Sequence, residues 1–326
     1  MKNLLCLIAV STIFAATNFA QDLHWYKGNT HTHTINSDGD STPADAITWY
    51  REHGYNFLFL TDHEYINNIE ALNGVYGKPG SFIVLSGQEV TDGYNKKAFH
   101  SNSLGANALV RPNRLPGGVE TLQKNIDDIV KAGGVAQVNH PNFLWSLTAN
   151  ELVKLRNYSL LEIHNGHPLV NNQGGGGVPS AEEMWDSVLT SGTLVFGIAD
   201  DDVHSFKRFD DPTAARPGQG WIYVRAPSLD LAAILSALKK GDFYASTGVE
   251  LTDYQAGPKQ VVVTVKQQQW SKYRIQFIGR GGRILSESDT TPATYSIKGD
   301  EGYVRARILE SNGKKAWTQP VMVRNN

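Results

Sequence analysis

The chain has almost no cysteine, since Cys6 is the only one among its 326 residues. An intramolecular disulfide is therefore excluded, as is any metal site built from several cysteine ligands. A strong excess of one charge is also lacking, because the formal net charge is −2, and this disfavours electrostatic binding of long nucleic acids. Metal chemistry in this chain therefore depends on histidine and carboxylate ligands.

The first twenty residues have the pattern of an export signal. Lys2 supplies a positive charge, residues 4–14 are mostly apolar, and small residues follow up to Ala20. The apolar part is too short to span a bilayer, and Cys6 lies too early in it for lipid attachment. We predict a signal peptide over residues 1–20 and an exported protein, periplasmic or secreted, with no membrane contact after cleavage. The alternative is a buried N-terminal helix.

Strands and helices alternate over residues 25–246, in a chain whose 40% hydrophobic and 19% charged content is ordinary for folded proteins. Thr42 followed by Pro43 is a typical helix start, and short apolar strands separated by helices indicate parallel βαβ units. Strands are expected at residues 25–30, 57–60, 82–85, 97–104, 135–138, 160–163, 194–198 and 221–224. Helices are expected at residues 41–53, 118–132, 148–156 and 228–240, with a further one opening at a capping box over 180–183.

The pattern changes after Gly248. β-branched or alternating segments, separated by glycine-containing turns and not interrupted by helical periodicity, indicate a run of strands. These strands are expected at residues 261–265, 273–277, 303–308 and 317–323. They predict a small antiparallel β-sandwich. The expected organisation is therefore a signal peptide, an α/β domain over residues 21–248 and the β-sandwich over residues 249–326.

Residues that commonly bind metals follow most strands of the first part. His31 and His33 lie two positions apart, so an extended strand presents both imidazoles on one face. Further candidates are Asp38, His63, Glu89, His100, His140, Asp202 and His204. β/α barrels place their active sites at the carboxyl ends of strands, and imidazoles beside carboxylates suit Zn, Mn or Fe. The sequence therefore predicts a metal site at this end of the domain.

These motifs resemble, in order, those of the PHP (polymerase and histidinol phosphatase) superfamily. The matching segments are His31-x-His33, Ser37-Asp38-Gly39, Thr61-Asp62-His63, Glu89, His100, Asn139-His140-Pro141 and Asp202-x-His204. Segments similar to a secreted branch that includes carbaryl-hydrolase-type enzymes are residues 243–248, Tyr303-Val304-Arg305 and Ala316-Trp317-Thr318. The resemblance implies a distorted (β/α)7 barrel, followed by the small antiparallel β-sandwich, and a metal-dependent hydrolase activity.

The resemblance also implies three divalent ions, which would be Mn, Fe or Zn. One would take His31, His33, Glu89 and Asp202, a second would share Glu89 and take His100 and His140, and the third would take Asp38, His63 and His204. Clustered cations make bound water acidic and hold phosphate oxygens. Asp202 or His204 is the candidate proton shuttle to the leaving oxygen. Asp200 and Asp201 directly precede Asp202, so the sequence alone leaves open which of the three aspartates is the ligand. The Asp-x-His spacing favours Asp202.

Three further residues are candidates for substrate binding. Arg111 and Arg114 lie in a loop after His100, and an arginine fork suits phosphate or carboxylate. His164 follows a predicted strand on the face expected to be active. The alternative is that all three are ordinary surface or loop residues. Asp62 is a candidate for orienting the metal ligand next to it in the sequence.

The sequence thus predicts an exported metal-dependent phosphoesterase that hydrolyses small phosphate mono- or diesters with a metal-bound hydroxide at a trinuclear site. Alternatives are an aryl carbamate or carboxyl ester hydrolase on the same site, and a 5'-3' exonuclease or nucleotide phosphatase. A third is a non-catalytic, metal-stabilised binding protein whose β-sandwich engages a glycan or partner. The expected partner is a small-molecule ester rather than bulk nucleic acid, and the oligomeric state stays open.

Overall fold

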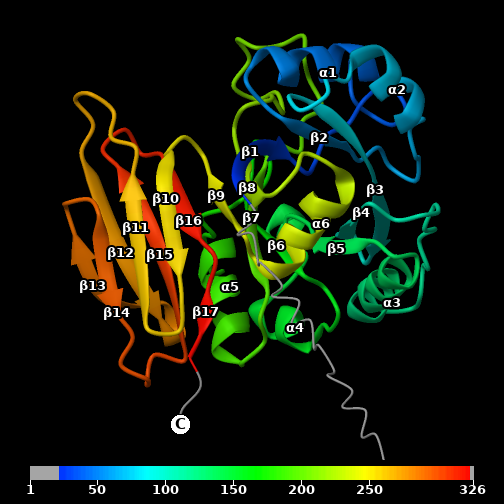
Figure 1. Ribbon diagram of the computed structural model, residues 1–326. Helices are drawn as coiled ribbons and strands as arrows, with labels where there is room; N and C mark the ends of the chain where they lie inside the picture. Colours follow the sequence, from blue (N-terminus) through cyan, green and yellow to red (C-terminus); the bar gives the residue numbers. More distant parts are fainter. Residues whose placement is uncertain (1–21, 324–326) are drawn as a thin grey trace, which may run out of the picture.

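The computed structural model describes residues 22–323, which form a barrel-like α/β part beside a β-rich part (Figure 1). The predicted signal peptide, residues 1–20, lies outside the described residues. Within residues 22–323 every helix falls short of the length and apolarity that crossing a membrane requires.

Seven strands form the barrel-like part. They are β1 (His24–Asn29), β2 (Phe57–Leu60), β3 (Ile83–Tyr94), β4 (Lys97–Leu104), β5 (Val135–Val138), β6 (Leu160–Asn165) and β7 (Phe196–Asp200). Strand β4 pairs antiparallel with both of its neighbours, and the other pairs are parallel. Just beyond the ends of β1 and β7, Thr32 forms an isolated parallel bridge with Val203. The expected α/β class is confirmed, and among the described residues β1 and β7 meet only at this bridge rather than through a ladder.

Helices connect these strands, and most begin at a side-chain cap. They are α1 (Pro43–Glu52), α2 (Ile69–Tyr76), α3 (Gly118–Lys131), α4 (Ala149–Lys154), α5 (Ala181–Thr190) and α6 (Leu231–Lys240). Thr42, Thr148 and Ser180 each form a complete capping box. Helix α2 is absent from the sequence-based expectation. It has only eight residues, and its apolar side chains Ile69, Leu72 and Tyr76 are partly rather than fully buried against the core, so its periodic signal is short.

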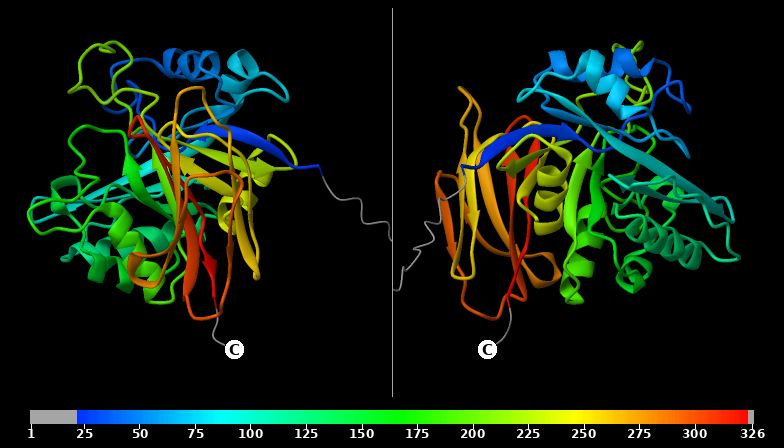
Figure 2. Two further views of the ribbon diagram at one scale, coloured as in Figure 1. Left: turned by 90° about the vertical axis from the view of Figure 1, so that its left-hand side faces the viewer. Right: turned by 45° about the vertical axis from the view of Figure 1, so that its right-hand side comes forward.

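The barrel sheet continues into the β-rich part without a break (Figure 2). β8 (Trp221–Ala226) pairs antiparallel with β1 and with β9 (Phe243–Ser246), and β9 pairs with β16 (Lys315–Thr318). The remaining strands of this side are β15 (Tyr303–Glu310), β12 (Tyr273–Gly279), β13 (Arg283–Ser288) and the short β17 (Val321–Met322), with the 3-10 turn η2 (Arg280–Gly282). The domain boundary after Gly248 stays a prediction, because β9 shares ladders with both parts.

A second, three-stranded sheet completes the β-rich part. It consists of β10 (Leu251–Ala256), β11 (Gln260–Val265) and β14 (Ala293–Ser296) in the order β10-β11-β14. Buried side chains of both sheets, including Val261, Val263, Phe277 and Ile308, form one apolar core between them. The two-layer β-sandwich expected from the sequence is therefore present. The last expected strand is divided in two at Pro320, which lacks the N–H that a ladder requires.

Buried charges join the β-rich part to helix α5. Arg305, fully buried, donates from Nε and Nη2 to Asp186 at 2.9 and 2.7 Å and from Nη2 to Glu182 at 2.8 Å. Gln319 reaches the barrel instead, where it exchanges two hydrogen bonds of 2.8 and 2.9 Å with the backbone of Gly197. A buried guanidinium is costly unless it is paired in this way, so the contact fixes how the two parts sit together.

Candidate metal centre

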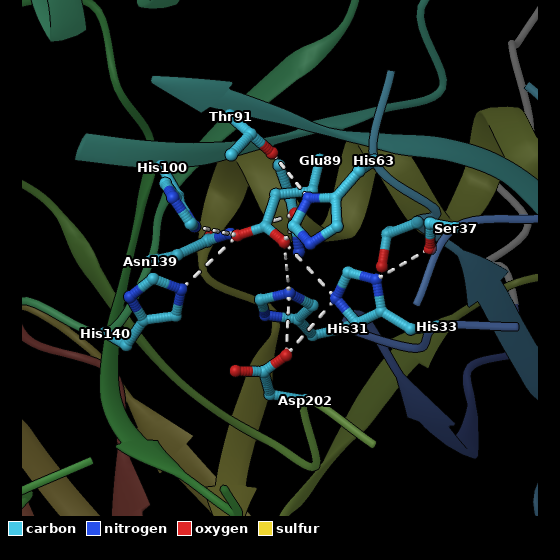
Figure 3. Close-up of polar contacts among 12 residues, drawn as sticks. His31, His33, Ser37, His63, Glu89, Thr91, His100, Asn139, His140 and Asp202 are labelled. Atoms are coloured by element: carbon cyan, nitrogen blue, oxygen red, sulfur yellow. Dashed lines mark hydrogen bonds and ion pairs between the residues drawn. The ribbon is translucent and has the colours of Figure 1, made fainter. Parts of the chain in front are cut away.

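His31 and His33 lie just past the end of β1 and point into the centre of the barrel (Figure 3). The backbone N–H of His33 donates to the carbonyl of Val203 at 3.0 Å, so the bridge between the ends of β1 and β7 fixes this segment. Both rings are fully buried, and their centroids are 5.1 Å apart. Both Nε2 atoms lie 3.2 Å from an oxygen of Asp202. The expected pairing of the two imidazoles on one face is thus present.

Glu89, on β3, lies at the centre of the histidines. Its Oε1 is 3.1 Å from His100 Nδ1 and 3.3 Å from His140 Nε2. Its Oε2 is 3.2 Å from ring nitrogens of three further histidines, His31, His33 and His63. Burial by itself raises the pKa of Glu89, but the facing histidines, His31 first, hold it well below its usual range. The carboxylate is therefore ionised, with one oxygen facing each of two groups of imidazoles.

A third group surrounds Asp38 at the more open side. Asp38 carboxylate oxygens lie 3.4 Å from Nε2 of His63 and of His204, and 3.5 Å from Nδ1 of His33. Burial raises the pKa of Asp38, but hydrogen bonds from His204 and His63 outweigh it and lower the pKa. A Cβ at Gly39 would lie 2.6 Å from the carbonyl oxygen of His33, so this turn needs a glycine for its close approach to the histidine strand.

The residues present fit divalent metal ions. Histidine and carboxylate side chains form four groups, and within each group the possible ligand atoms lie within 4.8 Å of one another. The groups are His33, Asp38, His63 and His204; His31, His33 and Asp202; Glu89, His100 and His140; and His31, Glu162 and Asp200. Three buried ring nitrogens, Nε2 of His31 and of His33 and Nδ1 of His140, have no hydrogen-bond partner among the described residues. Buried polar atoms are rarely left without a partner, and a cation would satisfy them. The first three groups correspond to the three ligand sets implied by the family resemblance. They differ in two positions, because Glu89 belongs to one group instead of two and His33 to two groups instead of one.

Two of these ligand residues have unusual backbone conformations. His140 has a φ of 22° and Asp202 a φ of 46°, both in the sparsely populated region for residues other than glycine. Neither side chain is more than slightly exposed. Backbone strain of this kind persists where the surrounding structure imposes it, and it gathers at functional sites.

The run of three aspartates after β7 divides into three roles. Asp202, the residue that the Asp-x-His spacing favours, lies 3.2 Å from Nε2 of both His31 and His33. Asp201 accepts backbone N–H groups from Gly218, Gln219 and Gly220 at 2.6–2.9 Å and the hydroxyl of Tyr50 at 2.6 Å. Asp200 lies deeper in the barrel, where burial and the neighbouring charge of Glu162 raise its pKa well above the usual range. The Asp-x-His spacing therefore selected the residue that faces the cluster.

Glu162, on β6, is a site residue that the sequence analysis missed. Its Oε1 accepts from His31 Nδ1 at 2.7 Å, and its Oε2 accepts the backbone N–H of His140 at 2.6 Å. A carboxylate behind a metal-binding imidazole sets which nitrogen is free for the metal. The available signal was an acidic residue inside the apolar run 160–163, since a charge there must be buried and paired.

Asp62 does not orient His63 as expected. Its carboxylate accepts the N–H and hydroxyl of Thr34 and the hydroxyl of Ser37, at 2.7–3.0 Å. It therefore holds the loop that carries Asp38. The neighbour of His63 Nδ1 is instead the hydroxyl of Thr91 on β3.

The three candidate substrate residues lie in different places. Arg114 is exposed and lines a groove next to the metal cluster, and Arg111 is exposed in the same loop. His164 is not brought to the cluster, because the register of β6 against β7 shifts between Glu162 and His164. Its ring lies against Trp317 of the β-rich part, with centroids 6.3 Å apart. Burial there lowers the pKa of His164 to about 4.

A cavity of about 240 Å³ opens onto the cluster. Besides the candidate ligands it is lined by Phe143, from the 3-10 turn η1 (Phe143–Trp145), and by His167 and Leu169. Nδ1 of His167 accepts the backbone N–H of Leu169 at 3.1 Å. The neutral ring of His167 therefore carries its proton on Nε2. Its ring lies 5.3 Å from that of His204, which makes it a polar group of the site that no motif had indicated.

The fold and this arrangement place the chain among proteins of PHP-like architecture. A two-domain protein from Bacteroides vulgatus, described as containing a predicted PHP-like metal-dependent phosphoesterase, has a TM-score of 0.53 and 13% identity to this chain. The match covers 92% of this chain and 96% of that chain. This likeness confirms the expected PHP-like fold with its second domain. The resemblance to the carbaryl-hydrolase branch stays a prediction.

Other solved structures are similar over a smaller part of the chain. A putative metal-dependent phosphoesterase from Bifidobacterium adolescentis is 15% identical, with 55% of this chain and 87% of that chain covered and a TM-score of 0.38. An amidohydrolase from Chromobacterium violaceum is 15% identical, with 56% and 88% covered and a TM-score of 0.40. No protein-family model and no curated protein matches the chain.

Proposed function

We propose that the protein is an exported metal-dependent hydrolase, and specifically a phosphoesterase that acts on small phosphate mono- or diesters. The observation that carries this proposal is the convergence of five imidazoles on Glu89, at 3.1–3.3 Å, with Asp202 and Asp38 completing two neighbouring groups. A structural metal site needs far fewer ligands. The PHP-like fold and the order of the motifs support the same conclusion.

The candidate ligands divide among three positions for divalent ions, and Mn, Fe and Zn all accept this donor set. Glu89 would share its two oxygens between two of them, and Asp38 would hold the third at the open side. Such ions, when bound, supply an acidic water for attack and neutralise the phosphate oxygens. Behind them, Glu162 keeps the proton of His31 on Nδ1 and so leaves Nε2 free. The backbone carbonyl of Asp202 does the same for His204, whose Nδ1 lies 2.9 Å away.

The leaving oxygen needs a proton, and the site offers more than one donor. Asp202 and His204 are the candidates from the sequence. His167 is a further one, because its Nε2 carries a proton and the residue lines the cavity without belonging to any of the ligand groups. General acid catalysis requires such a group within hydrogen-bond reach of the leaving atom. Phe143 and Leu169 line the same cavity and make this part of its wall apolar.

An aryl carbamate or carboxyl ester hydrolase is the second candidate. The apolar Phe143 and Leu169 beside the cluster would suit an aryl leaving group. The same metal chemistry serves a carbonyl carbon as well as a phosphorus. We therefore keep this activity as an alternative that the assay must separate from the first.

The test uses the purified chain loaded with Mn, with metal content measured by elemental analysis. Substrates are p-nitrophenyl phosphate, bis(p-nitrophenyl) phosphate and 1-naphthyl N-methylcarbamate. We expect phosphate-ester turnover that a chelator abolishes and that is lost in His140→Ala but kept in His24→Ala, which changes an exposed histidine. Turnover of the carbamate alone would replace the phosphoesterase by the second candidate. Bound metal without turnover of any substrate would refute both and favour a binding protein.

A further inference from the structure

A second, larger cavity adjoins the metal cluster. This groove, of about 680 Å³, shares His100 and Phe143 with the smaller cavity over the metal cluster, so the two cavities adjoin at these side chains. Thr91, which contacts His63, lies at the same junction. The groove is lined by the β3–β4 hairpin, by the loop before α3 and by η1, and the hairpin itself extends away from the barrel (Figure 1). The groove is therefore the neighbouring space for a molecule that is held at the cluster.

The far part of the groove is strongly cationic. Lys96, Lys97 and Arg114 all line it, and within residues 22–323 none of these three side chains forms an ion pair or a hydrogen bond. The one carboxylate among the lining residues is Asp92, which is buried. An oxygen of Asp92 is already occupied by the backbone N–H of Asn113 at 3.0 Å and by Asn125 at 2.8 Å. Three positive charges thus remain available to a ligand.

The hairpin sets the distance between these cations and the metals. His100 pairs with Thr91 in the ladder, and the chain reaches the hairpin turn at Asn95 and Lys96, both with positive φ. The four residue steps from Lys96 to His100 span roughly 13 Å of strand. Apolar side chains line the interval, namely Phe143, Leu144 and Leu115. Lys96 and Lys97 thus lie at the hairpin end of the groove and His100 at the cluster end, while the loop that carries Arg114 lies against Asp92 between them.

We propose that this groove binds a second negatively charged group on the substrate. The inference rests on the proposed phosphoesterase function and narrows it: the ester carries, on the part that leaves, an apolar spacer ending in a phosphate, sulfate or carboxylate. Lys96 and Lys97 supply point charges at the far end, and Arg114 supplies a planar fork for the same group. The backbone N–H of Asn113, bonded to Asp92, holds the loop that carries Arg114.

The test measures binding rather than turnover. Alkylphosphonates that end in a methyl group are compared by calorimetry with phosphonates of equal chain length that end in a carboxylate, on the Mn-loaded protein. We expect the carboxylate to strengthen binding about tenfold or more at a matching length. This gain should disappear in the double variant Lys96→Ala/Lys97→Ala, shrink in Arg114→Ala, and decrease as salt is added.

The matched control is Lys239→Ala/Lys240→Ala, which removes two adjacent exposed lysines from the last turn of α6 and should keep the full gain. Equal affinities for the two series at every length in the unmodified protein would overturn the second subsite, while phosphonate binding itself would leave the proposed function standing. Failure of both series to bind the Mn-loaded protein would instead refute the phosphoesterase proposal, and the subsite with it. A gain that survives in the Lys96→Ala/Lys97→Ala variant would also refute the assignment.

Discussion

Replacing Glu162 with glutamine should weaken metal binding although Glu162 lies behind the histidines. The carboxylate accepts two short bonds, from His31 Nδ1 at 2.7 Å and from the backbone N–H of His140 at 2.6 Å. Glutamine has the same shape, but it offers one acceptor oxygen and a donating NH₂ in place of two acceptors. One of these two bonds must therefore be lost, because the NH₂ group of the glutamine would face either the N–H of the His31 ring or the backbone N–H of His140.

The size of the effect follows from these contacts. A hydrogen bond to a charged group contributes about 1.5–3 kcal/mol, and loss of a partner behind a metal ligand typically lowers metal affinity by about 10–100-fold. The two ranges agree, because a factor of ten corresponds to about 1.4 kcal/mol. We therefore expect Glu162→Gln to bind Mn or Zn about 10–100-fold more weakly.

The assay is a competition titration against a chelating dye, with circular dichroism to verify folding. Glu52→Gln is the matched control, because Glu52 is exposed at the end of α1. An unchanged metal affinity in a folded Glu162→Gln protein would refute the argument that this carboxylate prepares His31 for the metal. A loss of equal size in Glu52→Gln would refute it as well.

Three further predictions concern stability. Chelation should lower the melting temperature, and metal returned at a hundredfold excess over its Kd should restore about 2.7 kcal/mol; a melting temperature that chelation leaves unchanged would contradict the metal centre. Arg305→Ala leaves Asp186 and Glu182 buried without their cation, so urea denaturation should show that the free energy of unfolding falls by about 3–5 kcal/mol. The control Arg274→Ala removes an exposed ion pair and should lower it by less than about 1 kcal/mol. Similar losses in the two variants would refute the role of the buried pair. Burial lowers the pKa of His164 from 6.5 to about 4. Between pH 6.5 and pH 4 the unfolded chain therefore binds a proton at His164 that the folded chain does not bind, so the free energy of unfolding should fall as the pH drops through this window. Urea denaturation of metal-free protein at both ends of the window should show a smaller fall for His164→Phe, and an identical fall would show that His164 does not titrate as described.

The structure brings together the candidate ligands that the sequence indicated, and they could be indicated because their information is local. Most follow the end of a strand, while Glu89 and His100 lie within β3 and β4. Short motifs identify the ordered set, so it did not depend on knowing how the strands pair, and their role as metal ligands stays a prediction. Glu162 was missed because its role depends on which way its side chain points within the barrel. His164 shows the same limit, since the shift in register beyond Glu162 turns it toward Trp317.

The sequence also did not show that the two parts of the chain share one sheet. The pairing of β9 with β16 joins residues that are about seventy positions apart, as Ala245 with Trp317, and no local pattern encodes such a contact. The β-sandwich was expected from its alternating strands and turns, but its short strands β10, β13 and β14 were not expected. Their sequences are more polar or more irregular, and they become strands through pairing with stronger neighbours.

The shared strand β9 has a consequence for any attempt to shorten the protein. Cutting the chain after Gly248 would remove β16 and leave one side of β9 with free backbone N–H and C=O groups, next to buried apolar residues such as Tyr244. An uncovered strand edge of this kind recruits other chains and promotes aggregation. The α/β part is therefore not a module that can be excised, and a hinge between the two parts would have to break the backbone hydrogen bonds of a continuous sheet. Engineering of this protein should keep both parts and alter only the loops around them.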